Sequence, residues 1–150
     1  MVLRVGAPVA GRVTGLAAVP DPVFSGAMVG PGTAIDPERA PGEATAPIGG
    51  TLVKLHPHAF VVVSDDGRGV LVHLGIDTVQ LQGRGFTLLA EEGKRVEAGQ
   101  PLIRWDPAAV ESSGRSPVCP VIALDAGAAA LGEVRQDGRV AHGDLIFEWS

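Results

Sequence analysis

The chain has 150 residues, the usual size of one domain, and we expect residues 1–150 to form a single domain. Its net charge of −5 and the lack of any block of like charges argue against nucleic-acid binding. The single cysteine, Cys119, excludes an internal disulfide, and no apolar run is long enough for a membrane span or a secretory signal. We therefore expect a cytoplasmic protein.

Short apolar runs separated by glycine and proline follow one another along the chain, which contains 21 Gly and 12 Pro. This rhythm is typical of short strands joined by tight turns, as in an all-β sandwich or barrel. We expect strands at residues 2–5, 11–16, 50–55, 59–65, 69–76, 101–105, 117–124 and 144–149. A weak helical pattern is confined to residues 86–93 and 107–114.

A proline-led segment recurs along the chain, as APVAGRV at residues 7–13, APIGGTL at 46–52 and, more faintly, SPVCPVI at 116–122. This repetition indicates a duplicated architecture. Residues 20–44, rich in Pro and Gly, are expected to form an ordered surface loop system. Aromatic residues make up only 4% of the chain, so the core should be mainly aliphatic, capped by Trp105 and Trp149, with Cys119 buried and inert.

Histidines are concentrated in residues 56–77, which read HPHAFVVVSDDGRGVLVHLGID. His56, His58 and His73 lie there, beside two valine-rich runs with an Asp-Gly pair between the runs. Converging imidazoles can bind a metal, hold a phosphoryl group or relay a proton. The apolar neighbours of His58 and His73 disfavour the charged ring and so keep a nucleophilic nitrogen free. For His56, as for His142 elsewhere, a structural role is expected.

The turn between the two valine-rich runs decides whether His58 and His73 can meet. A type I′ turn with Asp66 and Gly67 at its centre would pair Phe60 with His73 and make the two histidines diagonal neighbours on one face. A two-residue turn placed one position earlier would set them directly opposite each other. A three-residue loop would put them on opposite faces of the hairpin.

Four stretches of the chain closely resemble one known family: VPDPVFSGAMVGPGTAI, HAF, VHLGIDTVQLQGRGF and AEEGKRVEAGQPLI. This family is the glucose-type enzyme IIA of the bacterial phosphoenolpyruvate-dependent sugar phosphotransferase system. The resemblance extends from about residue 5 to the C-terminus, and the motif around His73 (residues 72–79) is specific. It implies a compact antiparallel β-sandwich of the duplicated hybrid type, with few short helical turns.

The resemblance also implies a phosphotransferase component that carries a phosphoryl group rather than acting as a stand-alone catalyst. In the family, the residue that corresponds to His73 accepts the group on Nε2 from the protein HPr and passes it to a sugar-specific IIB domain of the IIBC transporter. His58 corresponds to the neighbour that stabilises the group, and we expect a backbone carbonyl near Gly75 to fix the His73 tautomer. The implied partner-binding residues are two acids and five apolar residues: Asp21, Asp77, Val23, Phe24, Met28, Val29 and Val79.

Two features of the chain depart from the family pattern. His56 replaces a threonine that commonly precedes the HAF histidine by two residues, so the proton relay can differ or a third imidazole can share the task. The first expected strand begins almost at Met1, without the longer tail of many members, so membrane contact is expected only through the transporter partner. We expect a monomer; regulatory targets are open, and the sugar is not encoded here.

Two other classes of protein share part of the pattern. Lysostaphin-type zinc peptidases use an HxH and an HxxxD motif, which occur here at residues 56–58 and 73–77 but in the reverse order. Biotinyl and lipoyl carriers resemble residues 91–103, yet neither Lys54 nor Lys94 has the sequence context of a modified lysine. No cofactor is expected to be required, although His58 and His73 are possible zinc ligands.

Overall fold

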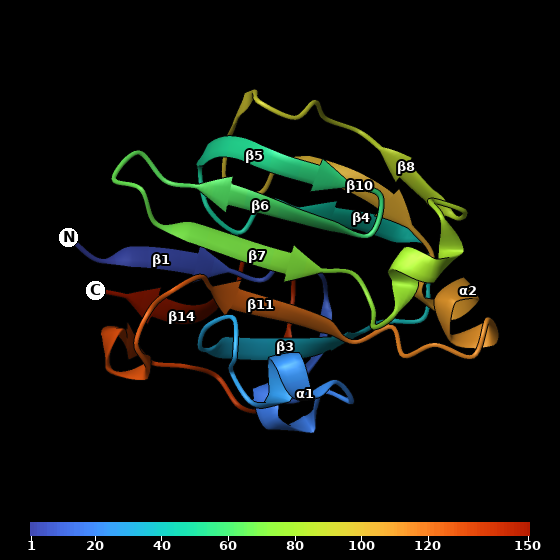
Figure 1. Ribbon diagram of the computed structural model, residues 1–150, viewed down its shortest axis with the longest axis horizontal. Helices are drawn as coiled ribbons and strands as arrows, with labels where there is room; N and C mark the ends of the chain where they lie inside the picture. The colour runs from blue at the N-terminus through green and yellow to red at the C-terminus, as the bar shows by residue number, and fades with distance from the viewer.

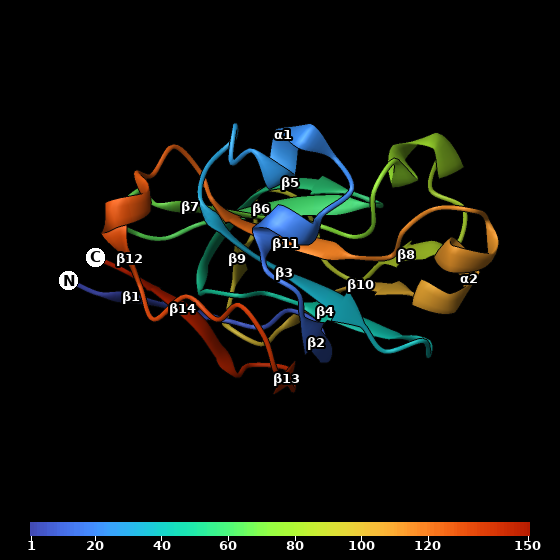
Figure 2. The same ribbon diagram turned by 90° about the horizontal axis from the view of Figure 1, so that it is seen from below.

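The computed structural model describes residues 1–150 as layers of antiparallel strands (Figures 1 and 2). The largest sheet has eight strands, in the order β13-β2-β3-β11-β7-β6-β5-β9. In chain order, these strands are β2 (Gly11–Val13), β3 (Gly32–Pro37), β5 (Gly50–His56), β6 (Ala59–Val63), β7 (Gly69–His73), β9 (Arg95–Val96), β11 (Cys119–Ala123) and β13 (Arg139–Val140). Every strand pair in the chain is antiparallel, so the predicted all-β antiparallel fold is confirmed.

Two three-stranded sheets complete the layers, in the orders β1-β14-β12 and β4-β10-β8. Their strands are β1 (Leu3–Gly6), β4 (Gly42–Thr45), β8 (Phe86–Leu88), β10 (Pro101–Trp105), β12 (Leu131–Gly132) and β14 (Leu145–Trp149). The helical elements are short: α1 (Pro22–Ser25), α2 (Pro107–Ser112) and the 3-10 turns η1 (Leu16–Ala18), η2 (Thr78–Leu81) and η3 (Ala128–Ala130). No helix is long and apolar enough to cross a bilayer.

Alternation along β6 and β7 divides their side chains between the core and the outer face. Phe60, Val62, Val70 and Val72 are fully buried in the main hydrophobic core. Because successive residues of a strand point to opposite faces, His73 at the end of β7 points outward. The expected aliphatic core is confirmed, and the buried residues Trp105, Trp149 and Cys119 lie within it.

A second, smaller cluster of buried residues covers part of the outer face of the eight-stranded sheet. α1 and η1 lie over β3 and β11 there (Figure 2). The cluster consists of Leu16, Val19, Phe24, Ala34, Ile76, Val118 and Ile122. The outer face is thus apolar next to His73.

Residues 20–44 are not the surface loop system that their Pro and Gly content predicted. They contain α1, β3 and β4, and β3 is a central strand with Ala34 and Ile35 fully buried. A proline cannot donate a ladder hydrogen bond, but Pro31 precedes β3 and Pro37 ends it, so the residues between them pair normally. These two prolines therefore mark the ends of a strand and do not interrupt it.

The two segments with a helical pattern behave differently. Residues 107–114 contain α2, which begins at Pro107 and is capped by the Asp106 side chain, an acceptor for the Ala108 N–H at 3.0 Å. Residues 86–93 form no helix: β8 pairs with β10, and the Phe86 ring stacks on Trp105 with 6.0 Å between centroids. Packing against the core outweighs the weak helical preference of so short a segment.

Arg68 fastens the C-terminal strand, and its replacement by alanine should destabilise the fold. Its guanidinium donates to the Trp149 carbonyl, lies 5.7 Å above the Trp149 ring and pairs with Asp66 at 2.7 Å. The Arg68→Ala change should lower the free energy of unfolding by about 2 kcal/mol in urea titrations. The control, Arg4→Ala, removes a long pair at 3.8 Å between the exposed Arg4 and the half-buried Glu148 and should cost less than about 0.5 kcal/mol. Equal losses for both variants would contradict this account.

Candidate functional site

The hairpin of β6 and β7 has a different register from the one predicted. Ala59 pairs with His73, and the strands are joined by a three-residue loop between Ser64 and Arg68 instead of a type I′ turn. A type I′ turn needs positive φ at both central residues, whereas only Gly67 of this loop has it, at 91°. The Ser64 hydroxyl bonds to Asp66 and accepts the Arg68 N–H at 3.1 Å, which stabilises the longer loop.

His58 and His73 meet even though this register was expected to separate them. Their ring centroids lie 5.1 Å apart at an interplanar angle of 69°. The expectation that the two side chains point to opposite faces holds only for residues within paired strands. His58 belongs to no strand and occupies the two-residue turn between His56 and Ala59. The His58 carbonyl accepts the Leu74 N–H at 2.7 Å, which fastens this turn to the chain just after His73.

His73 is held in one tautomer by the bend that follows β7. Its Nδ1 lies 2.5 Å from the Gly75 carbonyl oxygen, and since a carbonyl only accepts, Nδ1 carries the proton. Nε2 therefore keeps a free lone pair. The predicted role of a carbonyl near Gly75 is confirmed. The buried Thr78, which sequence reasoning missed although it lies in the motif, donates its hydroxyl to Leu74 O at 2.8 Å and supports this bend.

Burial keeps both rings neutral near pH 7. It lowers the pKa of His73, and the Gly75 carbonyl, Asp21 and Asp77 only partly oppose that shift. Burial likewise lowers the pKa of His58 to about 4, with smaller contributions from the neighbouring rings of His73 and His56. A neutral imidazole is the nucleophilic form, so the site is ready to react at neutral pH.

These pKa shifts predict how stability changes with pH. An unfolded His58 binds a proton near pH 6.5 while the folded one does so only near pH 4, so the unfolded state binds more protons between these values. Stability is therefore retained above pH 6.5 and falls as the pH drops from 6.5 to 4. Urea unfolding at several pH values should show a shallower fall for His58→Gln than for the unchanged protein. Parallel curves would contradict the assignment.

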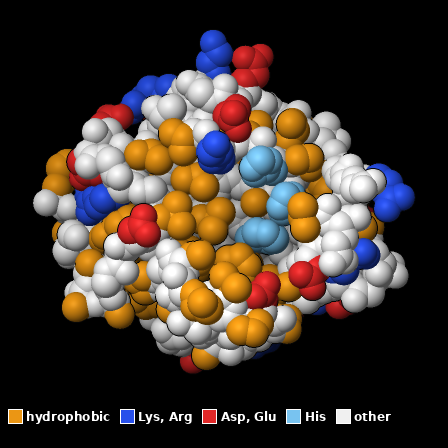
Figure 3. All heavy atoms as spheres, in the orientation of Figure 1, with side chains coloured by type: hydrophobic (Ala, Val, Ile, Leu, Met, Phe, Trp, Pro, Cys, Tyr) orange, Lys and Arg blue, Asp and Glu red, His pale blue; other side chains and the backbone are white.

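The histidines lie at the centre of a face with apolar side chains around them and acidic ones nearby (Figure 3). Of the apolar residues implied as partner-binding, Val23, Met28 and Val79 are 42%, 74% and 59% exposed. Phe24, in contrast, is buried and packs its ring against His73 at 5.3 Å between centroids. Val29 is half-buried against the smaller cluster. Exposed apolar residues grouped on one face are typical of a docking surface.

The two acids flank His73 from different elements. Asp21 caps α1 and accepts the Val23 N–H at 3.0 Å. Asp77 precedes η2 with a left-handed backbone (φ 60°) and its side chain makes no capping bond, which leaves an exposed carboxylate. Both charges act to raise the pKa of His73.

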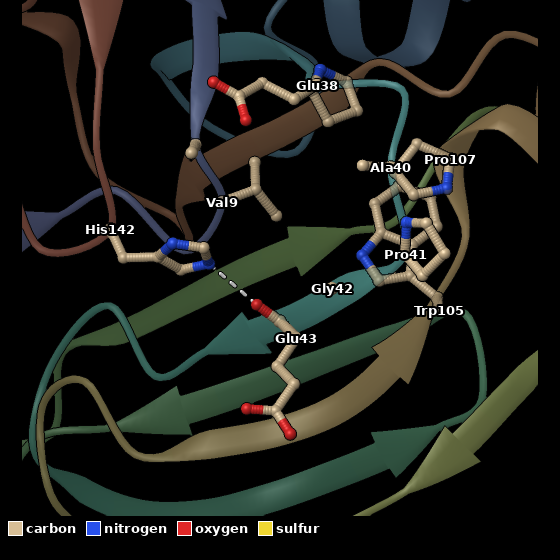
Figure 4. A pocket seen from close by; sticks show the side chains of 11 residues that line it. Val9, Glu38, Ala40, Pro41, Gly42, Glu43, Trp105, Pro107 and His142 are labelled. Atoms are coloured by element: carbon tan, nitrogen blue, oxygen red, sulfur yellow. Dashed lines mark hydrogen bonds between the residues drawn. The ribbon is translucent and has the colours of Figure 1, made fainter.

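A separate cavity of about 100 Å³ contains none of these residues (Figure 4). It lies between the start of β4, the start of α2 and His142, over the buried Trp105. His142 is exposed, and its Nε2 lies 2.8 Å from the Glu43 carbonyl oxygen. This bond agrees with the structural role expected for His142.

No group of three or more His, Cys, Asp or Glu side chains is arranged to hold a metal ion. His58 and His73 supply two imidazoles, whereas a protein zinc site uses three or four protein ligands. The geometry is that of a neutral, oriented nucleophile on an open apolar face.

Such a site on an antiparallel β fold suits a protein that receives a small group on a histidine and passes it on. Residues 3–129 match the family described as the phosphoenolpyruvate-dependent sugar phosphotransferase system, EIIA 1, and the chain belongs to this family. The fold is also similar to the solved structure of glucose permease IIA from Mycoplasma capricolum, with a TM-score of 0.91 and 35% sequence identity over 99% of this chain and 96% of that one.

The predicted family is thereby confirmed, and the protein is a phosphoryl carrier, a phosphotransferase component of the sugar phosphotransferase system. Family membership implies an HPr protein and a IIB domain as partners, and the family is not known to need a cofactor. Nothing in the comparisons supports the zinc peptidase alternative.

Proposed function

We propose that Nε2 of His73 accepts the phosphoryl group from phospho-HPr and that the same atom passes it to a sugar-specific IIB domain. The observation that carries this proposal is the bond from His73 Nδ1–H to the Gly75 carbonyl, which leaves Nε2 as the free nucleophile. Residues 1–150 act in this proposal as one IIA domain on the cytoplasmic side of the membrane, where the transporter partner presents its IIB domain.

The transfer exchanges one phosphorus–nitrogen bond for another. The lone pair of His73 Nε2 attacks phosphorus, the bond to the phosphohistidine of HPr breaks, and that electron pair returns to the HPr imidazole. The His73 ring gains positive charge as the new bond forms, and the Gly75 carbonyl is placed to stabilise it through Nδ1–H. In the second transfer, a nucleophile of the IIB domain attacks phosphorus, the bond to His73 Nε2 breaks, and its electron pair returns to that nitrogen. In such reactions the protein contributes mainly alignment and charge stabilisation.

His58 provides a hydrogen-bond donor for the transferred group. Its ring is inclined at 69° to the His73 ring, with 5.1 Å between centroids, and in the free protein it is neutral. A dianionic phosphoryl group beside it raises the pKa of His58, the opposite of the effect of its present neighbours. An N–H donor held in place before the reaction stabilises the phosphoryl oxygens without reorganisation. His58 thus assists transfer, while His73 carries the group.

One face serves both partners in turn. The exposed apolar side chains of Val23, Met28 and Val79 offer contacts for a partner, and the carboxylates of Asp21 and Asp77 attract its basic residues. HPr and the IIB domain must reach the same nitrogen, so their docking surfaces on this protein overlap. Transient complexes of this kind suit a monomer. Two imidazoles are an incomplete zinc site, so the transfer as proposed requires no metal, although His58 and His73 could still hold zinc if a partner added a ligand.

The proposal is tested by incubating the protein with enzyme I, HPr and labelled phosphoenolpyruvate. One phosphoryl group per chain should be bound in an acid-labile, base-stable form, as expected of a phosphohistidine, and it should pass on when a IIB domain is added. No labelling of this protein by an HPr that is itself labelled would overturn the proposal.

A further inference from the structure

The orientation of the His58 ring is not set by hydrogen bonds. His73 is tied to Gly75 O and His142 to Glu43 O, but neither nitrogen of His58 bonds to any group of the chain. Only its backbone is fastened, through the carbonyl that accepts Leu74 N–H at 2.7 Å. A histidine in a surface turn can rotate about two side-chain bonds, so something else must restrain the orientation of this ring.

Ring packing on two sides supplies this restraint. The rings of His73 and His58 are inclined at 69° to each other, with 5.1 Å between centroids. The His56 ring lies nearly parallel to His58, at 5.8 Å and 24°. Aromatic rings in such offset arrangements attract each other beyond the simple burial of their area. His58 is therefore packed between a half-buried ring and an exposed one.

The hairpin tip holds His56 in place for this contact. His56 ends β5 and pairs with Ala59, which closes the turn through Pro57 and His58. Pro57 packs against Gly83, where an added Cβ would lie 3.3 Å from the proline Cγ. The backbone on both sides of His58 is thus defined, and the contact with His56 limits the freedom that remains.

We propose that His56 is a positioning residue for phosphoryl transfer: its ring stacks on His58 and keeps the donor edge of His58 directed at the group on His73. This inference rests on the function proposed above and concerns an interaction that the ring plane of His56 makes, independent of its charge. A flat apolar ring at position 56 should therefore replace it, and a side chain without a ring should not.

The test compares His56→Ala, His56→Gln and His56→Phe in single-turnover transfer from the phosphorylated protein to a IIB domain. His56→Ala and His56→Gln should accept label to full stoichiometry but pass it on about threefold to tenfold more slowly, the range expected for loss of one aromatic pair. His56→Phe should transfer within about twofold of the unchanged protein. Lys54→Ala, an exposed residue of the same strand, is the matched control and should change nothing.

Two further measurements separate positioning from stability. Because His56 is exposed, thermal unfolding should occur at the same temperature in all variants within about 2 °C. NMR signals of the His58 ring should move in His56→Ala and His56→Gln and remain near their original positions in His56→Phe, after the effect of the new ring is taken into account. Both readouts apply even to the unphosphorylated protein.

Three results would overturn the inference: transfer by His56→Ala as fast as that of the unchanged protein, transfer by His56→Phe as slow as that of His56→Ala, or loss of rate that simply follows loss of stability. The second would assign the role to the polar or charged groups of His56. An unchanged protein that takes no label at all would instead refute the proposed function, so the two failures are distinguishable.

Discussion

Replacing His73 with glutamine is expected to abolish phosphoryl acceptance from HPr. Glutamine keeps a polar side chain on the outer face of β7 but has no nucleophilic nitrogen, and no other ring has its Nδ1–H tied to a carbonyl in this way. The variant should remain folded, since His73 lies outside the main core. The measurement is label bound per chain after incubation with enzyme I, HPr and labelled phosphoenolpyruvate.

His58→Gln is the matched comparison in the same assay. It should bind label to full stoichiometry, because the acceptor is intact, yet pass it to a IIB domain about 100-fold more slowly. Glutamine replaces a donor held in place by ring packing with a flexible amide, and loss of one preorganised donor has an effect of this size. Undiminished labelling of His73→Gln would show that the acceptor is another residue. Equal loss of labelling in both variants would show that the two rings do not divide the work as proposed.

Gly75→Ala should damage the fold and the site together. Gly75 has a left-handed backbone (φ 82°), and an added Cβ would lie 2.7 Å from Thr78 Cγ2 and 3.0 Å from the Ser116 carbonyl oxygen. The strained backbone costs about 1–2 kcal/mol and the overpacking about 1–3 kcal/mol, so the free energy of unfolding should fall by about 3 kcal/mol. Relief of the clash shifts the carbonyl that orients His73, so labelling should also slow by at least tenfold.

Gly67→Ala is the control that measures how much stability is lost through the strained backbone alone, without overpacking. Gly67 also has positive φ, at 91°, but nothing lies within 4 Å of its added Cβ. The cost should be about 1 kcal/mol, and labelling should be unchanged. Urea unfolding and the labelling rate distinguish the two variants. The same loss of stability in both would mean that the contacts around Gly75 do not matter.

Much of the fold could be predicted because short apolar runs in the sequence indicate the strands of the core. Residues 59–63 and 69–73 became β6 and β7 as expected, with Val62 and Val70 fully buried. β3 was missed because its prolines read as breakers, although their position at the ends of the strand is compatible with pairing. β8 was misread as helical because three residues carry little periodicity, and its pairing with β10 is a contact distant in sequence.

The site was predictable in its residues and less so in its geometry. The motif around His73 led to the acceptor candidate and to the Gly75 carbonyl, both of which depend on local sequence. The predicted hairpin register, which was to bring His58 and His73 together, was wrong. The register follows a three-residue loop stabilised by Ser64 and Arg68. The two rings meet because His58 lies in a turn. A strand-based rule cannot describe a residue outside a strand.

The packing of side chains around the site could not be predicted from the sequence. Phe24 was expected in an exposed docking surface but lies against the His73 ring, since α1 folds over β3 and β11 and turns that side chain inward. The stacking of His56 on His58 likewise depends on the angle at which the β5–β6 turn presents the two rings. Such contacts follow from tertiary packing, which no local pattern specifies.

The central claim is that the Gly75 carbonyl holds the proton on Nδ1 of His73 and leaves Nε2 to take the phosphoryl group. Long-range proton–nitrogen NMR spectra of the nitrogen-15-labelled protein, before and after phosphorylation, test it directly. We expect a protonated Nδ1 in both states and phosphorus coupled to Nε2 of His73 after transfer. Phosphorus bound to Nδ1 of His73, or to any nitrogen of His58, would contradict the account.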